Sequence, residues 1–353
     1  MLNKNIWLLN FSSSYSGGGL RRLVETAKWF DKRDGGYFII HQKAYKYLKE
    51  YSNKNVYYVV TQNKIRRLFD DGYYLKNILD MIGTPDIYFS YGLPVFFRIG
   101  KVNWFHISNA LPLTTRKISM SLVQRLKMIL LKYRILKSLD HIQIISGESE
   151  FSLKLLKDVS QLQLDSIYFS VLPNGFSEHE LNNVQKIFND EEHYAITIGT
   201  FAYKKLGIAF RLFKYLQEKD KKLKTFIIVG NRNDLPFELR TNKNVIVDIG
   251  STRESVIDLL ACAKYYISAS QIENSSIAAL EGLVFSRSVF LSDIPSHREM
   301  LKDMQYEELY VQGINDLFLV ANIESNPGLP NINSWEQATL KFYEIFEKYN
   351  EMY

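Results

Sequence analysis

The chain has 353 residues, more than one ordinary domain holds, so we expect two domains. Hydrophobic residues make up 46% of the sequence, a composition that supports buried cores and excludes a disordered chain. The single cysteine excludes a disulfide framework and a zinc site, and the formal net charge of +6 is moderate. Neither an N-terminal signal nor an apolar run of membrane-spanning length is visible, so we expect a cytoplasmic protein.

Short apolar runs alternate with helical patterns along the whole chain. In the first half we expect strands at 6–10, 37–41, 56–60, 86–90, 103–107, 142–146 and 166–172, and helices at 20–30, 64–81, 117–139 and 149–157. In the second half we expect strands at 195–198, 225–229, 245–248, 265–268, 289–291 and 309–311, and helices at 206–219, 253–262, 275–285, 296–301 and 335–349. Strands alternating with helices predict α/β domains with parallel sheets.

A turn signal, Pro173-Asn-Gly175, and a polar stretch to Glu192 separate the two halves. We therefore predict an N-terminal domain over 1–173 and a C-terminal domain over 190–330, with a last helix after the loop at 327–330.

Three glycines, Gly17, Gly18 and Gly19, follow the first predicted strand and open a helix. Glycine lets a ligand approach the backbone closely, and a helix N-terminus favours an anion. Gly18 and Gly19 are therefore candidates for ligand binding, and a flexible first loop is the alternative. The G-x-G-x-x-G spacing of dinucleotide-binding proteins is absent.

A basic segment runs from Arg116 to Lys137, with seven lysines and arginines and no acid. Apolar residues recur at helical spacing between the cations, which predicts a basic amphipathic helix. Two interpretations remain open: a packed helix with a solvated cationic face, and a helix that docks onto anionic lipid headgroups. Nucleic acid is not expected as a partner, because no zinc finger, RNA-binding signature or basic arm is present.

Several polar residues follow predicted strands, where doubly wound sheets bind ligands. His106 ends a strand of the first half and could hydrogen-bond a sugar hydroxyl or an acceptor, although a structural histidine is the commoner case. Gly230, Asn231 and Arg253 follow two strands of the second half, where glycines also serve plain turns.

Lys204 and Lys205 follow the strand at 195–198 and precede a helix. Cations there could neutralise a diphosphate leaving group. Taken alone, two ordinary surface lysines before a helix are the better explanation.

Two carboxylates eight positions apart give the most specific signal. Glu273 lies just before a predicted helix, and Glu281 lies inside it among apolar residues, where a carboxylate needs a partner. The helix starts at the carboxyl end of a strand, where unpaired N–H groups attract phosphate. At about 1.5 Å per residue the two carboxylates should lie roughly 9–12 Å apart, a separation that suits a nucleotide sugar. Two unrelated surface glutamates are the alternative.

These residues resemble the retaining glycosyltransferases of the GT-B fold, particularly glycosyltransferase family 4, whose Glu-x7-Glu motif Glu273 and Glu281 match. Similar features are the glycine-rich first loop followed by Arg, the hinge Leu172–Gly175, a Lys before the first helix of the second domain and the C-terminal helix. The resemblance implies an α/β protein with two Rossmann-like parallel-sheet domains facing a cleft. It also implies that a C-terminal helix, 335–350, packs back on an acceptor-binding N-terminal domain, and that the C-terminal domain binds the nucleotide sugar.

In the family, the first Glu binds the donor sugar and the second the ribose. The backbone between them, here Asn274, Ser275, Ser276 and Ile277, would meet the sugar and the diphosphate. The sequence departs from the family at Gly199-Thr200, where Gly-Arg is common, and at Lys205-Leu-Gly207, where Lys-Gly is usual. Lys205, then Lys204, are the cations expected at the phosphates, and we take Glu273, His106 and Lys205 as candidate catalytic residues.

The resemblance implies transfer of a hexosyl unit from a nucleoside-diphosphate sugar to an acceptor hydroxyl, with retention at the anomeric carbon. No Asp-x-Asp cluster appears in the right context, so we expect no metal and no cofactor. The basic segment favours a lipid-linked glycan acceptor in surface polysaccharide assembly (O-antigen, capsule or lipopolysaccharide), at the cytoplasmic face of the inner membrane. The alternatives are a non-catalytic sugar-nucleotide-binding subunit, a GT-B nucleotide-sugar isomerase and a peripheral membrane scaffold.

Overall fold

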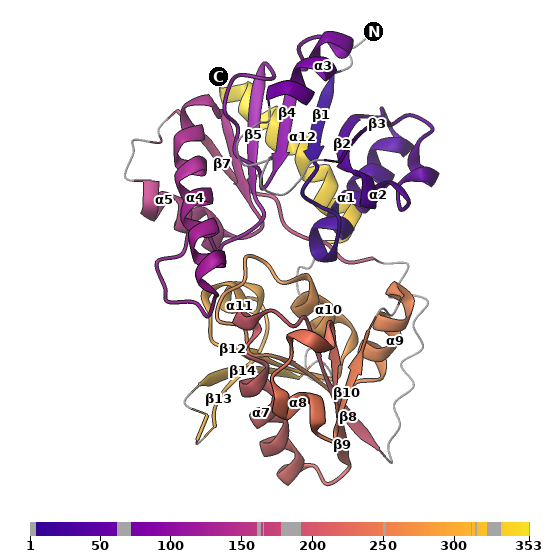
Figure 1. Ribbon diagram of the computed structural model, residues 1–353, viewed down its shortest axis with the longest axis vertical. Helices are drawn as coiled ribbons and strands as arrows, with labels where there is room; N and C mark the ends of the chain where they lie inside the picture. Colours follow the sequence, from indigo (N-terminus) through magenta and orange to yellow (C-terminus); the bar gives the residue numbers. More distant parts are fainter. Residues whose placement is uncertain are drawn as a thin grey trace. The chain divides into compact units, whose positions relative to one another are not determined.

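The computed structural model of the chain forms two compact units, each built around a seven-stranded sheet (Figure 1). It describes residues 5–61, 72–160, 164, 166–177, 192–249, 252–311, 313–314, 316–322 and 333–352. Unit 1 comprises residues 1–115, 121–175 and 335–353, and unit 2 comprises residues 116–120 and 176–334.

The sheet of unit 1 is parallel throughout, in the order β3-β2-β1-β4-β5-β6-β7. Its strands are β1 (Trp7–Phe11), β2 (Tyr37–His41), β3 (Val56–Val60), β4 (Ile87–Tyr91), β5 (Val102–Ile107), β6 (Ile144–Gly147) and β7 (Tyr168–Val171). Its helices are α1 (Gly17–Lys32), α2 (Gln42–Tyr45), α3 (Gly72–Ile82), α4 (Leu122–Ser138), α5 (Glu150–Ser160) and α12 (Trp335–Met352). The strand order reverses between β1 and β4, and ligands bind outside the carboxyl ends of strands at such a switch point.

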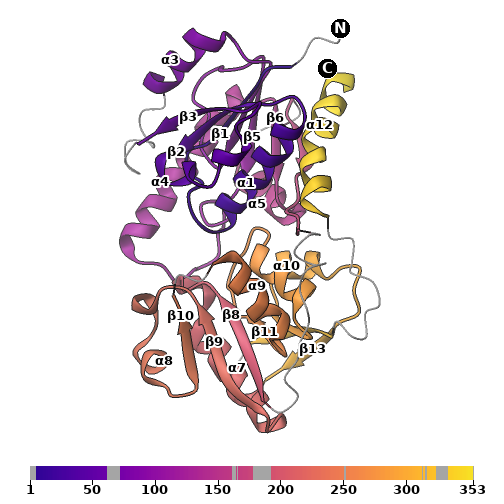
Figure 2. The same cartoon turned by 90° about the vertical axis from the view of Figure 1, so that its right-hand side faces the viewer.

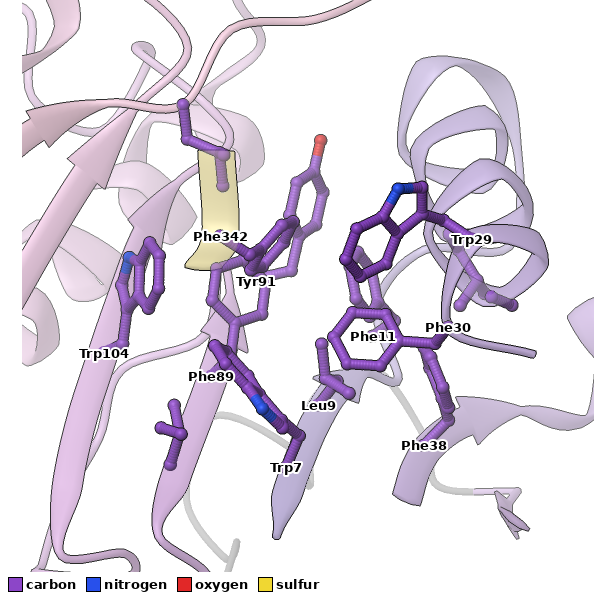
Figure 3. Close-up of a cluster of buried hydrophobic side chains, with 14 of the residues drawn as sticks. Trp7, Leu9, Phe11, Trp29, Phe30, Phe38, Phe89, Tyr91, Trp104 and Phe342 are labelled. Carbon is purple, nitrogen blue, oxygen red and sulfur yellow. The ribbon is translucent and has the colours of Figure 1, made fainter. Parts of the chain in front are cut away.

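The two faces of this sheet have separate cores. Helices α1 and α12 cover one face, and α3, α5 and the end of α4 cover the other. Figure 3 shows the aromatic side chains of the first core, where Phe342 of α12 packs 4.8 Å from Phe89 and 6.3 Å from Trp7 between ring centres. Each buried ring of this size stabilises the fold by about 1.5–3 kcal/mol. The last helix, which lies beside α1 in Figures 1 and 2, is therefore an integral part of unit 1.

The sheet of unit 2 has the order β10-β9-β8-β11-β12-β14-β13 and is parallel except at one edge. Its strands are β8 (His193–Ile198), β9 (Leu223–Val229), β10 (Val245–Asp248), β11 (Tyr265–Ser268), β12 (Ser288–Ser292), β13 (Glu307–Tyr310) and β14 (Leu317–Asn322). Its helices are α7 (Leu206–Lys219), α8 (Phe237–Thr241), α9 (Arg253–Cys262), α10 (Ile277–Phe285) and α11 (Pro295–Met300). Helices α9 and α10 cover one face and α7 and α8 the other, and the switch point lies between β8 and β11.

The predicted α/β class with two parallel-dominated sheets is confirmed. The second sheet departs from parallel pairing at one edge, where β14, a strand we did not predict, runs antiparallel to both β12 and β13. Part of the predicted helix 64–81 (residues 64–71), the glycine at 250 and the loop at 327–330 lie outside the described residues.

Three predicted helix starts are wrong. Helix α4 begins at Leu122, not at residue 117, because Ser121 caps it: its hydroxyl accepts the N–H of Gln124, whose side chain accepts the N–H of Ser121 in return. Helix α1 begins at Gly17, so the glycines form its first turn. Helix α10 begins at Ile277, because the residue before it, not Ser275, is the cap. No helix in the described part of the chain combines the length and apolar character of a membrane span.

Candidate functional site

The N-terminus of α10 lies at the carboxyl end of β11, beside the switch point of unit 2. The hydroxyl of Ser276 caps this helix and accepts the N–H of Ala279 at 3.2 Å. Asn274 and Ser276 are both buried, so the turn is packed into the fold. First-turn N–H groups have no partner within the helix, which gives this turn an affinity for anions.

Glu273 lies directly before this turn and is fixed by two donors. The ammonium of Lys204 lies 2.6 Å from its Oε1, and the hydroxyl of Ser270 donates to the same oxygen at 2.6 Å. Burial would raise the pKa of Glu273, but the charge and hydrogen bond of Lys204 and the hydrogen bond of Ser270 outweigh burial, and the pKa lies below its usual value. Glu273 is therefore an oriented, ionised acceptor for hydroxyl groups.

Glu281 has the partner that a carboxylate in an apolar helix requires. A guanidinium nitrogen of Arg253, the first residue of α9, lies 2.7 Å from Oε1 of the buried Glu281. The next residue, Gly282, faces the ring of Tyr266 on β11, and a Cβ at this glycine would lie 2.5 Å from that ring. The tight packing of α10 on β11 therefore sets the depth of Glu281.

The two neighbouring lysines diverge. Gly199, with φ of +97°, leaves room for Lys204, whose Cε would lie 3.2 Å from a Cβ at this glycine. Lys205 caps α7 with φ 49° and ψ 49°, and it is the one non-glycine residue of the described chain with positive φ. This conformation costs about 1–2 kcal/mol for an L-residue. The ammonium of Lys205 donates to the hydroxyl of Ser119 at 2.8 Å, whereas that of Lys204 lies on Glu273.

Thr200, at the position where the resembled family has Arg, connects two loops at the carboxyl ends of β8 and β9. Its Oγ1 accepts the N–H of Asn231 at 3.3 Å and donates to Asp234 at 3.2 Å. A Cβ at Gly230 would lie 2.5 Å from the methyl group of Thr200, so glycine is needed for this close approach. Gly230 and Asn231 therefore form a rim beside the two lysines' loop.

A buried histidine that the sequence analysis did not take as a candidate lies close to Glu273. His297 of α11 has no exposed surface, its Nδ1 lies 2.8 Å from the carbonyl oxygen of Ser292, and its charge would interact with that of Glu273. Burial lowers the pKa of His297 to about 4, so the imidazole is neutral near pH 7. The signal that could have found it is Pro295, which starts a helix directly after the strand neighbouring β11.

In unit 1, His106 belongs to a buried polar cluster at the strand ends. Its ring stacks on that of Tyr91 at 5.0 Å, its Nδ1 lies 2.8 Å from Oγ of Ser146, and its Nε2 lies 3.9 Å from Oε1 of Glu148. Burial lowers the pKa of His106 to about 4, although Glu148 opposes this. The side chain has no exposed surface, so contact with a substrate would require its neighbours to move.

Sequence reasoning missed the partners of His106. The hydroxyl of Tyr91 donates to Glu148 at 2.9 Å, and Arg22 donates to the carbonyl oxygen of Leu172 at 2.9 Å and to Asn174 at 3.3 Å. Tyr91 and Glu148 come at the carboxyl ends of β4 and β6, which was the available signal.

The glycines of α1 belong to the same edge of unit 1. A Cβ at Gly19 would lie 3.3 Å from Oγ of Ser14 and 3.5 Å from the ring of Tyr91, whereas Gly18 is exposed. Ser16, the residue before the helix, makes no capping hydrogen bond through its side chain. The first turn of α1 therefore keeps its affinity for an anion.

The candidate residues thus fall into separate groups. In unit 2 the structure pairs Lys204 with Glu273, pairs Arg253 with Glu281, and places Asn274–Ile277 at the helix start between the two carboxylates. Gly18, Gly19 and His106 belong to unit 1. Within the described residues, no group of three or more His, Cys, Asp or Glu side chains is placed to hold a metal ion.

Comparison with known proteins gives similarity in fold but not in sequence. No protein-family model matches the chain, and no curated protein is similar to it in sequence. HepE from Anabaena, solved with UDP-glucose, is 11% identical with a TM-score of 0.60, covering 99% of both chains. The N-terminal domain of trehalose-6-phosphate phosphatase from Candida albicans is 10% identical with a TM-score of 0.62, covering 98% of both chains.

A third similar structure is WaaG, a glycosyltransferase involved in lipopolysaccharide biosynthesis. It is 12% identical with a TM-score of 0.54, and the similarity covers 79% of each chain. Identities this low show the fold alone. The structural neighbours include GT-B glycosyltransferases, and the two-unit GT-B architecture that the resemblance implied is confirmed.

Proposed function

We propose that the protein is a glycosyltransferase that moves a hexosyl unit from a nucleoside-diphosphate sugar to an acceptor hydroxyl, with retention, as in family 4. The observation that carries the proposal is the largely buried Lys204–Glu273 pair, 12% and 11% exposed, beside the N-terminus of α10. An ionised carboxylate suits sugar hydroxyls, and a helix N-terminus with nearby cations suits a diphosphate. The similarity to HepE, which was solved with UDP-glucose, supports the same ligand class.

In the proposed complex, each part of the donor meets a different group. Glu273 accepts hydrogen bonds from the sugar, the backbone of Asn274–Ile277 meets the diphosphate, and Lys204 and Lys205 offset its charge. Glu281, held by Arg253, accepts the ribose hydroxyls. The rim of Gly230 and Asn231 lies towards the nucleoside.

The proposed reaction is a front-face displacement. The bond from the anomeric carbon to the phosphate oxygen breaks, the acceptor oxygen bonds to the same face, and the leaving phosphate takes the acceptor proton. The protein contributes positioning and charge stabilisation, which together lower the barrier without a protein nucleophile. We assign no step to His106, because it is neutral and buried.

The surface of α4 supports a membrane-bound acceptor. Leu122, Leu126, Ile129 and Tyr133 recur along one stripe and are 77%, 67%, 65% and 51% exposed. A helix packed through these residues would bury them, so a plain packed helix does not explain the stripe. Insertion of each large side chain into a lipid interface would stabilise binding by about 1.5–3 kcal/mol, and each neighbouring cation by about 1 kcal/mol.

We therefore propose that unit 1 binds the acceptor, and that the acceptor is a lipid-linked glycan at an anionic membrane surface, as surface polysaccharide assembly requires. Replacement of Arg125, Lys132 and Arg134 by Glu is expected to abolish cosedimentation with vesicles of phosphatidylglycerol. The control is the same charge change in unit 2 at three exposed lysines: Lys219, Lys221 and Lys224. Equal binding by both triple variants would refute docking through α4.

The donor is tested by thermal shift against a panel of nucleotide sugars. We expect one sugar nucleotide to raise the melting temperature and to be turned over in the presence of a lipid-linked acceptor. Glu273→Gln and Glu281→Ala should lose both effects, whereas Glu238→Gln, at an exposed glutamate of α8, should keep them. The proposal is contradicted if the protein binds no sugar nucleotide, or if Glu281→Ala binds and turns over the donor as well as the unaltered protein does.

The second candidate is a non-catalytic sugar-nucleotide-binding protein. One similar structure favours it: the N-terminal domain of a trehalose-6-phosphate phosphatase. That protein is not named for glycosyl transfer, so the fold also occurs outside proteins named as glycosyltransferases. This candidate predicts donor binding with neither transfer nor donor hydrolysis for any acceptor tested.

A further inference from the structure

Residues 116–120 form a strap that belongs to unit 2 although the chain on both sides of it belongs to unit 1. Ile118 is buried, and the backbone N–H of Ser119 donates to Oε1 of Gln271 at 3.0 Å. The hydroxyl of Ser119 accepts the ammonium of Lys205 at 2.8 Å. The strap is therefore attached to unit 2 by two hydrogen bonds through one serine.

These contacts connect the strap to both parts of the candidate donor site. The N–H of Gln271 donates to the carbonyl oxygen of Tyr203 at 2.8 Å, one residue before Lys204. Gln271 also lies two residues before Glu273 in the chain. One hydrogen-bonded group thus includes the strap, the loop that carries both lysines, and the loop that carries the sugar-binding carboxylate.

The backbone of Lys205 gives a second, independent reason to regard this contact as functional. Its left-handed conformation is one that glycine or asparagine adopts more easily, and strained non-glycine residues are concentrated at functional sites. A lysine side chain has many rotamers, and a single fixed acceptor removes most of that freedom. The hydroxyl of Ser119 is such an acceptor.

We propose that Ser119 is a positioning residue that holds the ammonium of Lys205 where it meets the donor diphosphate. An ammonium has three N–H donors, and the hydroxyl takes one and leaves the others for phosphate oxygens. Ser119 thereby replaces part of the orientation that a planar guanidinium would provide at the position of Thr200. This inference rests on the proposed function, because it assigns a role within the same donor site.

The test is a double-mutant cycle read out by binding, not by turnover. Ser119→Ala, Lys205→Ala and the double variant are titrated calorimetrically with inorganic pyrophosphate and with UDP. Lys205→Ala should weaken pyrophosphate binding at least tenfold, and Ser119→Ala should weaken it about three- to tenfold, since each removes a charge-assisted contact or its support. In the Lys205→Ala background, the Ser119 substitution should have no further effect.

Two variants separate positioning from folding. Ser119→Thr keeps the hydroxyl and should restore affinity, and Thr115→Ala, at an exposed residue just before the strap, should leave it unchanged. The proposal would be overturned if Ser119→Ala weakened pyrophosphate binding by the same factor with and without Lys205. It would also be overturned if Ser119→Ala bound pyrophosphate normally while Lys205→Ala bound it weakly. Failure of the unaltered protein to bind both pyrophosphate and UDP would instead overturn the proposed function.

Discussion

Replacing the two members of the Lys204–Glu273 pair separately and together should give very different stabilities. The charges lie 2.6 Å apart, and the side chains are only 12% and 11% exposed, so water screens the pair weakly. Removing one partner of a buried pair leaves a buried charge and typically costs about 3–5 kcal/mol. The residual exposure here lowers our expectation for Lys204→Met to about 2–3 kcal/mol. The pKa of Glu273 should rise, because the charge and hydrogen bond of Lys204 no longer oppose burial. The double variant with Met and Gln should lie within about 1 kcal/mol of the unaltered protein.

The positions of the tryptophans provide the assay. All four, Trp7, Trp29, Trp104 and Trp335, belong to unit 1, so urea unfolding followed by tryptophan fluorescence reports on that unit. Far-ultraviolet circular dichroism reports on both units. We expect the single variants to shift the part of the dichroism transition that fluorescence does not see, and to leave the fluorescence midpoint unchanged.

A control pair and a functional readout make the result decisive. The control is the more exposed Arg298–Asp293 pair, whose side chains are 40% and 29% exposed. Arg298→Met should lower the free energy of unfolding by less than about 1 kcal/mol. The Lys204/Glu273 double variant should be stable yet unable to bind the donor. If the double variant loses as much stability as the two single variants together, the two residues are not coupled. If the double variant still binds the donor, the role of the pair is structural only.

Three further results are expected. The free energy of unfolding of unit 1 should fall by up to about 3 kcal/mol between pH 6.5 and about 4, because His106 takes up its proton at a higher pH in the unfolded state than in the folded state. His106→Gln should flatten this pH profile, measured by tryptophan fluorescence. Gly282→Ala should destabilise unit 2 by about 1–3 kcal/mol, because its Cβ meets the ring of Tyr266, whereas Gly207→Ala, with nothing within 4 Å, should be neutral or stabilising in circular dichroism. Transfer should persist in EDTA, because Lys204 and Lys205 can offset the phosphate charge; strict metal dependence would contradict this.

Elements with a clean period and a clear end signal could be predicted from the sequence. Helices α7 and α9 and strand β10 have the predicted bounds. In α9 the reason is visible, since Thr252 caps the helix by accepting the N–H of Ser255, and the periodic stretch ends where the next strand begins. Here the local pattern and the tertiary structure agree.

The errors occur where tertiary structure or a local cap overrides the pattern. Strand β14 is antiparallel because it pairs with β12 and β13, and no local property of 317–322 determines its direction. The apolar period continues through residue 118, but Ile118 belongs to unit 2, while α4 begins in unit 1 after the cap at Ser121. The spacing of apolar residues does not indicate that the chain passes from unit 2 to unit 1 between residues 120 and 121.

In the candidate site, the residue types could be predicted but their pairing could not. Lys204 and Glu273 are 69 positions apart, and Lys205 and Ser119 are 86 apart, so only the folded sheet brings them together. For His106 the strand-end position allowed either a substrate contact or a structural role, and only the structure shows that its side chain has no exposed surface.

The departure at Thr200 and the strain at Lys205 have a common explanation. A family arginine after β8 would bring a planar, preorganised cation, and threonine instead fills the space opened by Gly230 and ties down the loop of Asn231. In the proposed donor site the cations come from the next turn, where Lys204 is paired with Glu273 and Lys205 with the hydroxyl of Ser119. A right-handed conformation at Lys205 would continue the following helix and carry the side chain along its axis. The left-handed one breaks that direction at a cost of about 1–2 kcal/mol, and among the described non-glycine residues it occurs only at this lysine, whose ammonium Ser119 holds.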